Sequence, residues 1–103
     1  MVESVDLLTS YSFEMKKFSS AQRHEIQLGV ENGLSKEQIL LYAKQENTWY
    51  FMREYRLGLM HGLPPEAILL YAKSKYNALE MQNMRERTEL LFESLHKMDI
   101  QYF

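Results

Sequence analysis

Residues 25–44 read EIQLGVENGLSKEQILLYAK, and residues 54–73 read EYRLGLMHGLPPEAILLYAK. The second stretch begins 54 − 25 = 29 positions after the first, and 12 of their 20 positions are identical. Self-similarity at a fixed period is typical of repeat architectures, in which each unit buries its apolar face against its neighbours. The sequence therefore predicts an all-α protein, a compact helical bundle of tandem two-helix repeats with a period of 29 positions.

The similarity continues on both sides of these stretches. Residues 13–19 lie 29 positions before residues 42–48, and residues 80–85 match residues 51–56, but no Gly-Leu pair follows them. We expect one domain over residues 1–103, with a half-repeat at 5–18, repeats at 19–47 and 48–76, and a long C-terminal helix at 77–98. A helix with a polar outer side is what the end of a repeat stack requires.

Each repeat is predicted to be a helix, a tight turn and a second helix. Gly33 and Gly62 suit the left-handed position that ends a helix, and Ser35 with Gln38 makes a capping box for the next one. In the second copy Pro65 suits the first helical position. Residues 39–43 read ILLYA, and the preceding capping box favours a helix over a buried strand. Because these five apolar residues leave no polar side, we expect neighbours on both sides of this helix.

Gly29 and Gly58 occupy the same place inside the first helix of each repeat. Glycine there costs about 1 kcal/mol relative to alanine, so a packing reason is expected. We predict that each glycine lets the following helix approach closely.

The C-terminal helix carries a stripe whose spacings alternate between three and four, as in a heptad pattern. Its members are Met81, Met84, Thr88, Leu91, Leu95, Met98 and Tyr102. Two interpretations are open: this face closes the end of the repeat stack, or it forms a homodimer seam through Met84, Leu91, Leu95 and Met98. The chain is accordingly expected to be a monomer or a homodimer.

Composition narrows the function classes. A net charge of −2 is far from the basic balance of a nucleic-acid scavenger. The absence of cysteine excludes disulfides, thiolate zinc sites and cysteine nucleophiles. No apolar run approaches the ~20 residues that cross a bilayer, and the N-terminus lacks a signal-peptide pattern. We expect a cytoplasmic protein that contacts no membrane.

Catalytic equipment is not recognisable in the sequence. His24, His61 and His96 lack the spacing of a metal motif and are interpreted as surface or boundary residues. The recurring carboxylates Glu25 and Glu54, and Glu37 and Glu66, are assigned to structural use at helix ends. No phosphate-binding loop or nucleophile elbow is present. We therefore expect a non-enzyme without metal or cofactor.

Partner binding is the function that these features favour. Arginine and aromatic side chains dominate protein-interface energetics, and Trp49, Tyr50, Arg53 and Arg56 lie on one predicted helix. Residues 35–59 also imitate a helix-turn-helix, which makes a small DNA-binding regulator the alternative. A recognition helix displays polar side chains to bases, however, and this one is largely apolar. A homomeric structural adaptor acting through the heptad stripe is the third hypothesis.

The repeat unit resembles a tandem helical repeat of proteins from mobile elements of Gram-positive bacteria. The family pattern, approximately QMxEIRxGLxxGLxxxx(I/V)xxYA, corresponds here to QRHEIQLGV at 22–30, then Gly33-Leu34 and Tyr42-Ala43. The second copy reads FMREYRLGL at 51–59, then Gly62-Leu63 and Tyr71-Ala72, so the resemblance covers residues 13–85.

Small proteins carried by mobile elements and phages include type II anti-CRISPR proteins, and this chain is similar to that class in its size, its lack of recognisable catalytic equipment and its rigid helical surface. This analogy would make the chain an inhibitor, in the cytoplasm of a bacterial host, that blocks an RNA-guided CRISPR nuclease by steric occlusion.

Overall fold

The computed structural model describes residues 14–102, and within them the side chains of residues 16–96. The described part consists of helices joined by turns and contains no strand. Its elements are a 3-10 helix η1 (Glu14–Lys17) and the helices α2 (Ser20–Glu31), α3 (Lys36–Tyr42), α4 (Trp49–Met60), α5 (Pro65–Ile68) and α6 (Ala78–Tyr102). The all-α prediction is thus confirmed. Most of the predicted half-repeat at 5–18 lies outside the described residues.

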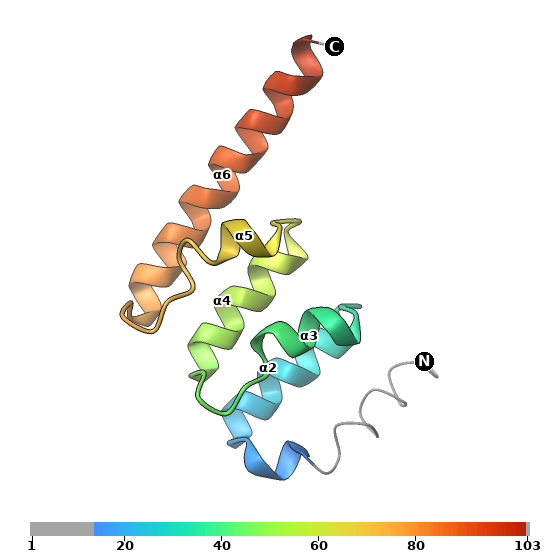
Figure 1. The fold of residues 1–103 in the computed structure, drawn as a ribbon, viewed down its shortest axis with the longest axis vertical. Coiled ribbons are helices and arrows are strands. Elements are labelled where there is room, and N and C mark those ends of the chain that lie inside the picture. Colours follow the sequence, from blue (N-terminus) through green and yellow to red (C-terminus); the bar gives the residue numbers. More distant parts are fainter. Residues whose placement is uncertain (1–13, 103) are drawn as a thin grey trace.

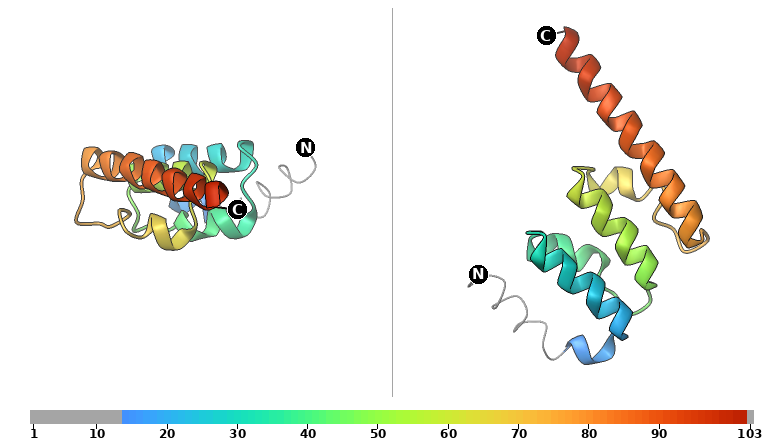
Figure 2. Two further views of the ribbon diagram at one scale, coloured as in Figure 1. Left: turned by 90° about the horizontal axis from the view of Figure 1, so that it is seen from above. Right: turned by 180° about the vertical axis from the view of Figure 1, so that it is seen from behind.

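The helices form two layers. The long helices α2, α4 and α6 lie side by side in one layer, and the short helices α3 and α5 lie in the other (Figures 1 and 2). Helix α4 contacts both α2 and α6, while α3 contacts α2 and α4. Each predicted repeat therefore holds one helix of each layer.

Local chemistry explains where these helices begin. Ser19 caps α2 and Ser35 caps α3, each through a capping box in which the hydroxyl accepts from a backbone N–H at 3.1 Å. The returning glutamines, Gln22 and Gln38, accept from the N–H groups of those serines. The box predicted at Ser35 is confirmed, and such a cap stabilises a helix start by about 1 kcal/mol.

The ends of α2 and α4 are formed by identical turns. Gly33 and Gly62 have φ of 84° and 87°, the left-handed conformation predicted for them. The N–H of Leu34 donates to the oxygen of Gly29 at 3.0 Å, and that of Leu63 to the oxygen of Gly58 at 2.9 Å. This is the Schellman pattern, and both leucines are buried as the pattern favours.

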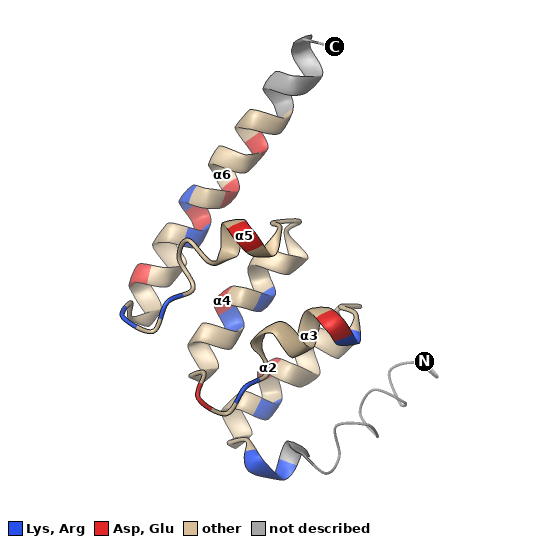
Figure 3. Ribbon diagram, viewed as in Figure 1, with Lys and Arg blue, Asp and Glu red and all other residues tan. Residues whose placement is uncertain are grey.

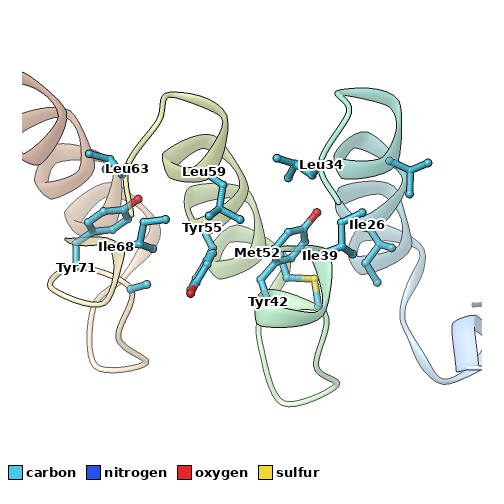
Figure 4. Packing of buried hydrophobic residues seen from close by; sticks show 12 residues of the cluster. Ile26, Leu34, Ile39, Tyr42, Met52, Tyr55, Leu59, Leu63, Ile68 and Tyr71 are labelled. Atoms are coloured by element: carbon cyan, nitrogen blue, oxygen red, sulfur yellow. The ribbon is translucent and has the colours of Figure 1, made fainter. Parts of the chain in front are cut away.

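The core lies between the two layers and around the helix contacts (Figure 4). Tyr42 and Tyr71 are both 0% exposed, and each buries its hydroxyl against the preceding long helix. Tyr42 donates to the backbone oxygen of Glu25 at 3.2 Å, and Tyr71 donates to that of Glu54 at 3.0 Å. The same packing contact thus recurs one repeat period later.

Gly29 and Gly58 make that contact feasible. A Cβ at Gly29 would collide with the Tyr42 hydroxyl, and one at Gly58 with the Tyr71 hydroxyl. The predicted close approach of the following helix at these glycines is confirmed.

One packing prediction is wrong. Helix α3 is not sandwiched: Leu40 and Leu41 are 44% and 41% exposed, and their counterparts Leu69 and Leu70 are 54% and 62% exposed. The reason is that α3 and α5 form the outer layer, so that only one side of each faces other helices.

Helix α6 is longer than predicted, ending at Tyr102 rather than near residue 98. It has 25 residues, whereas α4 has 12. One repeat period after Met60, the last residue of α4, is Glu89. The remaining 25 − 12 = 13 residues, 90–102, continue past the other helices (Figure 1). We call this segment the α6 extension.

Candidate interaction surface

An aromatic and an arginine side chain meet on the outside of α4. The Arg53 guanidinium carbon lies 5.0 Å from the ring centroid of Trp49, and Trp49 is 42% exposed. Tyr50 meets Trp49 edge to face, with ring centroids 5.7 Å apart. Trp49 and Arg53 share one side of the helix because they are four residues apart. We call Trp49, Tyr50 and Arg53 the aromatic–arginine surface.

The repeat does not require this surface. The corresponding residues are Ser20, Ala21 and His24 on α2, and Ala78, Leu79 and Gln82 on α6. Neither set combines an aromatic ring with a cation. The feature therefore belongs to α4 alone and is not a by-product of repeat packing.

The buried carboxylate of Glu54 holds the Arg53 side chain in place. Its Nε donates to Oε2 of Glu54 at 2.8 Å, and the Glu54 side chain is 1% exposed whereas that of Arg53 is 29% exposed. The guanidinium is thus oriented by Glu54 on one side and by the Trp49 ring on the other. Its side chain loses less freedom on binding than a free arginine would.

Arg56 does not belong to this surface, which corrects the predicted contact set. Its residue exposure is 7%, and its Nε and Nη2 both donate to Oε1 of Glu25 on α2. Its Nη1 donates to the amide oxygen of Asn32 at 3.3 Å. The physical reason is its position: Arg56 points toward α2, while Trp49 and Arg53 point outward. Of the four predicted residues, three lie together.

A second ion pair repeats this contact between α4 and α6. Arg85 Nε donates to Oε1 of Glu54 at 2.6 Å, one repeat period after the Arg56–Glu25 pair. Glu25 and Glu54 therefore lie mid-helix and bind arginine, which corrects their assignment to helix ends. Glu37 and Glu66 do lie in first turns, as predicted.

The charges around Glu54 form a continuous chain. Arg85 also donates from Nη1 to both oxygens of Glu89, at 3.0 and 3.1 Å, and Glu89 lies 2.6 Å from Nδ1 of His61. Burial alone would lower the pKa of Arg85, but hydrogen bonds to Glu54 and Glu89 outweigh it and raise that pKa. Between Glu80 and Glu89, acidic and basic residues are interleaved along α6 (Figure 3).

Four leucines of the outer layer are exposed. Leu40 and Leu41 lie on α3, whereas Leu69 and Leu70 lie in the turn that follows α5. We call them the leucine face. Sequence reasoning missed it because it took the five-residue apolar run for a helix covered on both sides.

The predicted seam on α6 divides in two. Met84 is half-buried and packs against the core, which agrees with a helix that closes the stack. Leu91 and Leu95 are 62% and 53% exposed on the α6 extension. The side chain of Met98 lies outside the described residues.

In the part of the chain that the structure describes, no group of three or more histidine or acidic side chains is placed to hold a metal ion. His24 and His96 are exposed, and His61 is bound to Glu89. Within the same residues, no helix combines the length and apolarity needed to cross a membrane.

Comparison with known proteins finds no family model, no curated protein and no solved structure that matches this chain.

Proposed function

We propose that this protein is a non-catalytic binding module whose partner is another protein, contacted through Trp49, Tyr50 and Arg53. The proposal rests on the exposed Trp49, whose ring centroid lies 5.0 Å from the guanidinium carbon of Arg53. Tryptophan, tyrosine and arginine are the residues in which interface binding energy concentrates.

Two features of the site support this proposal. The side chain of Arg53 is already ordered by Glu54, which lowers the entropy that binding would cost. The surface also stands on a helix that is braced on both sides by α2 and α6. A rigid helix positions contact residues more accurately than a loop does.

The more specific form of the proposal is a steric inhibitor of an RNA-guided CRISPR nuclease in the bacterial cytoplasm. It rests on the resemblance of residues 13–85 to repeats of mobile-element proteins. The aromatic–arginine surface would be the part that docks on the nuclease.

The positions of Arg53 and Arg56 favour a protein partner over DNA. The helix-turn-helix hypothesis relied on Arg53 and Arg56, and Arg56 is buried against Glu25. The outer side of α4 then offers one arginine beside two aromatic rings. Strong DNA binding depends instead on several cations that neutralise phosphates.

The experiment compares capture by the wild-type protein with capture by the double variant Trp49→Ala/Arg53→Ala. The immobilised proteins are exposed to lysate of a Gram-positive bacterium, and bound proteins are identified by mass spectrometry. His24→Ala is the matched control, because His24 is the counterpart of Arg53 on α2. We expect the control to retain the partner and the double variant to bind it at least roughly 30-fold more weakly, which corresponds to a loss of about 2 kcal/mol.

Three outcomes would contradict the proposal. Equal capture by both variants would mean that Trp49 and Arg53 do not contact the partner. Capture of no protein would mean that the chain is not a protein-binding module. Retention on DNA that weakens with salt would favour the regulator instead. The nuclease hypothesis has its own assay: DNA cleavage by a purified RNA-guided nuclease that is unchanged by added protein would end it.

A further inference from the structure

The α6 extension is a helix without a neighbouring helix among the described elements. Its 13 residues, 90–102, would span about 20 Å at 1.5 Å per residue. Isolated helices of this length are marginal in water, because most helix stability in proteins comes from packing of an apolar face. The extension is therefore expected to gain stability from something that covers it.

Its surface has the composition of a face that is meant to be covered. Leu90, Leu91 and Leu95 are 65%, 62% and 53% exposed, and Phe92 is 40% exposed. Leu91 and Leu95 are four residues apart and therefore adjoin on one side of the helix, whereas Leu90 and Phe92, two residues apart, lie on nearly opposite sides. Adjoining exposed apolar side chains of this kind are typical of interaction sites.

The patch continues a contact that already exists. Met81 is 1% exposed and Met84 is half-buried against the core, where α6 packs on α4. Leu91 and Leu95 follow Met84 at heptad spacing and so lie on the same side of α6. Helix α4 ends at Met60, so the apolar side of α6 continues beyond the helix that packs against it.

The spacing of the stripe agrees with a second copy of the same helix. Beyond Met84, which packs against the core, the positions 88, 91, 95 and 98 are separated by steps of 3, 4 and 3, an order that reads the same in both directions. An antiparallel copy of the same helix therefore matches every position, with Leu91 opposite Leu95 of the other copy. A surface that complements itself in this way is the requirement for a twofold dimer.

We propose that the α6 extension is the interface of a homodimer, in which two copies pair antiparallel about a twofold axis between Leu91 and Leu95.

The first test is the molecular mass in solution. We expect sedimentation equilibrium of the wild type to show a concentration-dependent approach to twice the monomer mass. The variant Leu91→Glu/Leu95→Glu should remain monomeric over the concentrations at which the wild type dimerises. Leu40→Glu/Leu70→Glu is the matched control, because these leucines are 44% and 62% exposed on the leucine face, and it should dimerise normally.

All four leucines are exposed in the single chain, so both variants should keep the wild-type circular dichroism spectrum. A wild type that is monomeric at every concentration would overturn the proposal. Equal loss of dimer in the two variants would also overturn it. The proposal is independent of the aromatic–arginine surface, so Trp49→Ala/Arg53→Ala should leave the dimer intact even if partner capture fails.

The second test fixes the direction of pairing. The chain has no cysteine, so single cysteines can be introduced without background. Leu91→Cys and Leu95→Cys proteins are mixed, one of them carrying a purification tag, and oxidised. In an equal mixture, random pairing gives twice as much mixed disulfide as either symmetric one, and antiparallel pairing predicts a mixed disulfide well above this twofold ratio. Predominance of the symmetric 91–91 disulfide would mean a parallel pair and would overturn the proposed geometry.

Discussion

The guanidinium of Arg56 on α4 donates two hydrogen bonds to one carboxylate oxygen of Glu25 on α2, at 3.2 Å from Nε and 3.1 Å from Nη2. Arg85 and Glu54 make the corresponding pair between α4 and α6. The two contacts between adjacent long helices are therefore built from the same charged residues, one repeat period apart. A buried charge is tolerated only when it is paired, so these residues also fix which helix lies next to which.

At each end of this series of ion pairs, an amide side chain occupies the corresponding repeat position. The residue that corresponds to Arg56 in α2 is Gln27, and the residue that corresponds to Glu54 in α6 is Asn83. Gln27 and Asn83 are exposed, whereas the four paired residues are buried. The sequence thus specifies two ion-paired contacts between long helices and provides no residue for a third.

Removing one member of a buried pair should be costly. We expect Arg56→Met to lower the free energy of unfolding by about 3–5 kcal/mol, because Glu25 would stay buried without its partner. Arg53→Met should cost less than about 1 kcal/mol, since Arg53 is 29% exposed and Glu54 would keep Arg85. Urea unfolding followed by circular dichroism measures both.

The double variant Glu25→Leu/Arg56→Met serves as the control for that prediction. Replacing both charges by apolar groups is often neutral, so most of the stability lost in Arg56→Met should return. Equal instability of the single and double variants would show that Arg56 acts through packing rather than through charge.

The packing at Gly29 can be tested by adding a Cβ atom at that position and then removing the hydroxyl oxygen of Tyr42. We expect Gly29→Ala to destabilise the fold by about 1–3 kcal/mol, because its Cβ would collide with the Tyr42 hydroxyl. Adding Tyr42→Phe removes that oxygen and should recover part of the loss. Thermal unfolding of the two variants and of Tyr42→Phe alone measures the recovery.

Gly58 should respond differently to the same treatment. Its Cβ would lie 2.9 Å from Cγ1 of Ile68, whereas the Cβ of Gly29 would lie 3.3 Å from Cγ1 of Ile39. Removing the Tyr71 hydroxyl therefore leaves a second clash in place. Gly58→Ala/Tyr71→Phe should recover less than Gly29→Ala/Tyr42→Phe, and equal recovery would mean that the isoleucines adjust freely.

The local features of the fold could be predicted because their causes are local. The capping box joins Ser35 to Gln38, three residues away, and the turn at Gly33 depends on a single left-handed residue. The close approach at Gly29 was also predictable, since glycine inside a helix needs a reason. Each of these follows from residues that are neighbours in sequence.

The candidate site was harder to predict because its geometry depends on contacts between distant residues. Arg56 looked like a companion of Arg53 on one helix, but its partner Glu25 lies 31 residues away. A signal was present, because glutamate recurs at 25 and 54 and arginine at 56 and 85 with the same period. The exposure of Leu40 required knowledge of the layers, which no residue near it specifies.

Tyr71 should make the fold sensitive to alkali. Burial raises the pKa of its hydroxyl above the ordinary value of 10.0. The unfolded chain therefore loses this proton at a lower pH than the folded chain, and stability present below pH 10 is lost as the pH rises beyond it. We expect a slope of up to about −1.4 kcal/mol per pH unit from this group. Urea unfolding at several pH values measures it, and a Tyr71→Phe protein with the same slope would contradict the assignment.

Alanine should have unequal effects at two positions that the repeat makes equivalent, Gly62 and Leu91. Gly62 has φ of 87° and ends α4, so Gly62→Ala should cost about 1–2 kcal/mol. Leu91 continues α6 where a glycine would have ended it, and it is 62% exposed. Leu91→Ala should therefore change the stability of the dilute protein by less than about 0.5 kcal/mol. Urea unfolding at low protein concentration separates this effect from dimerisation, and a large loss in Leu91→Ala would mean that its side chain is covered within the single chain.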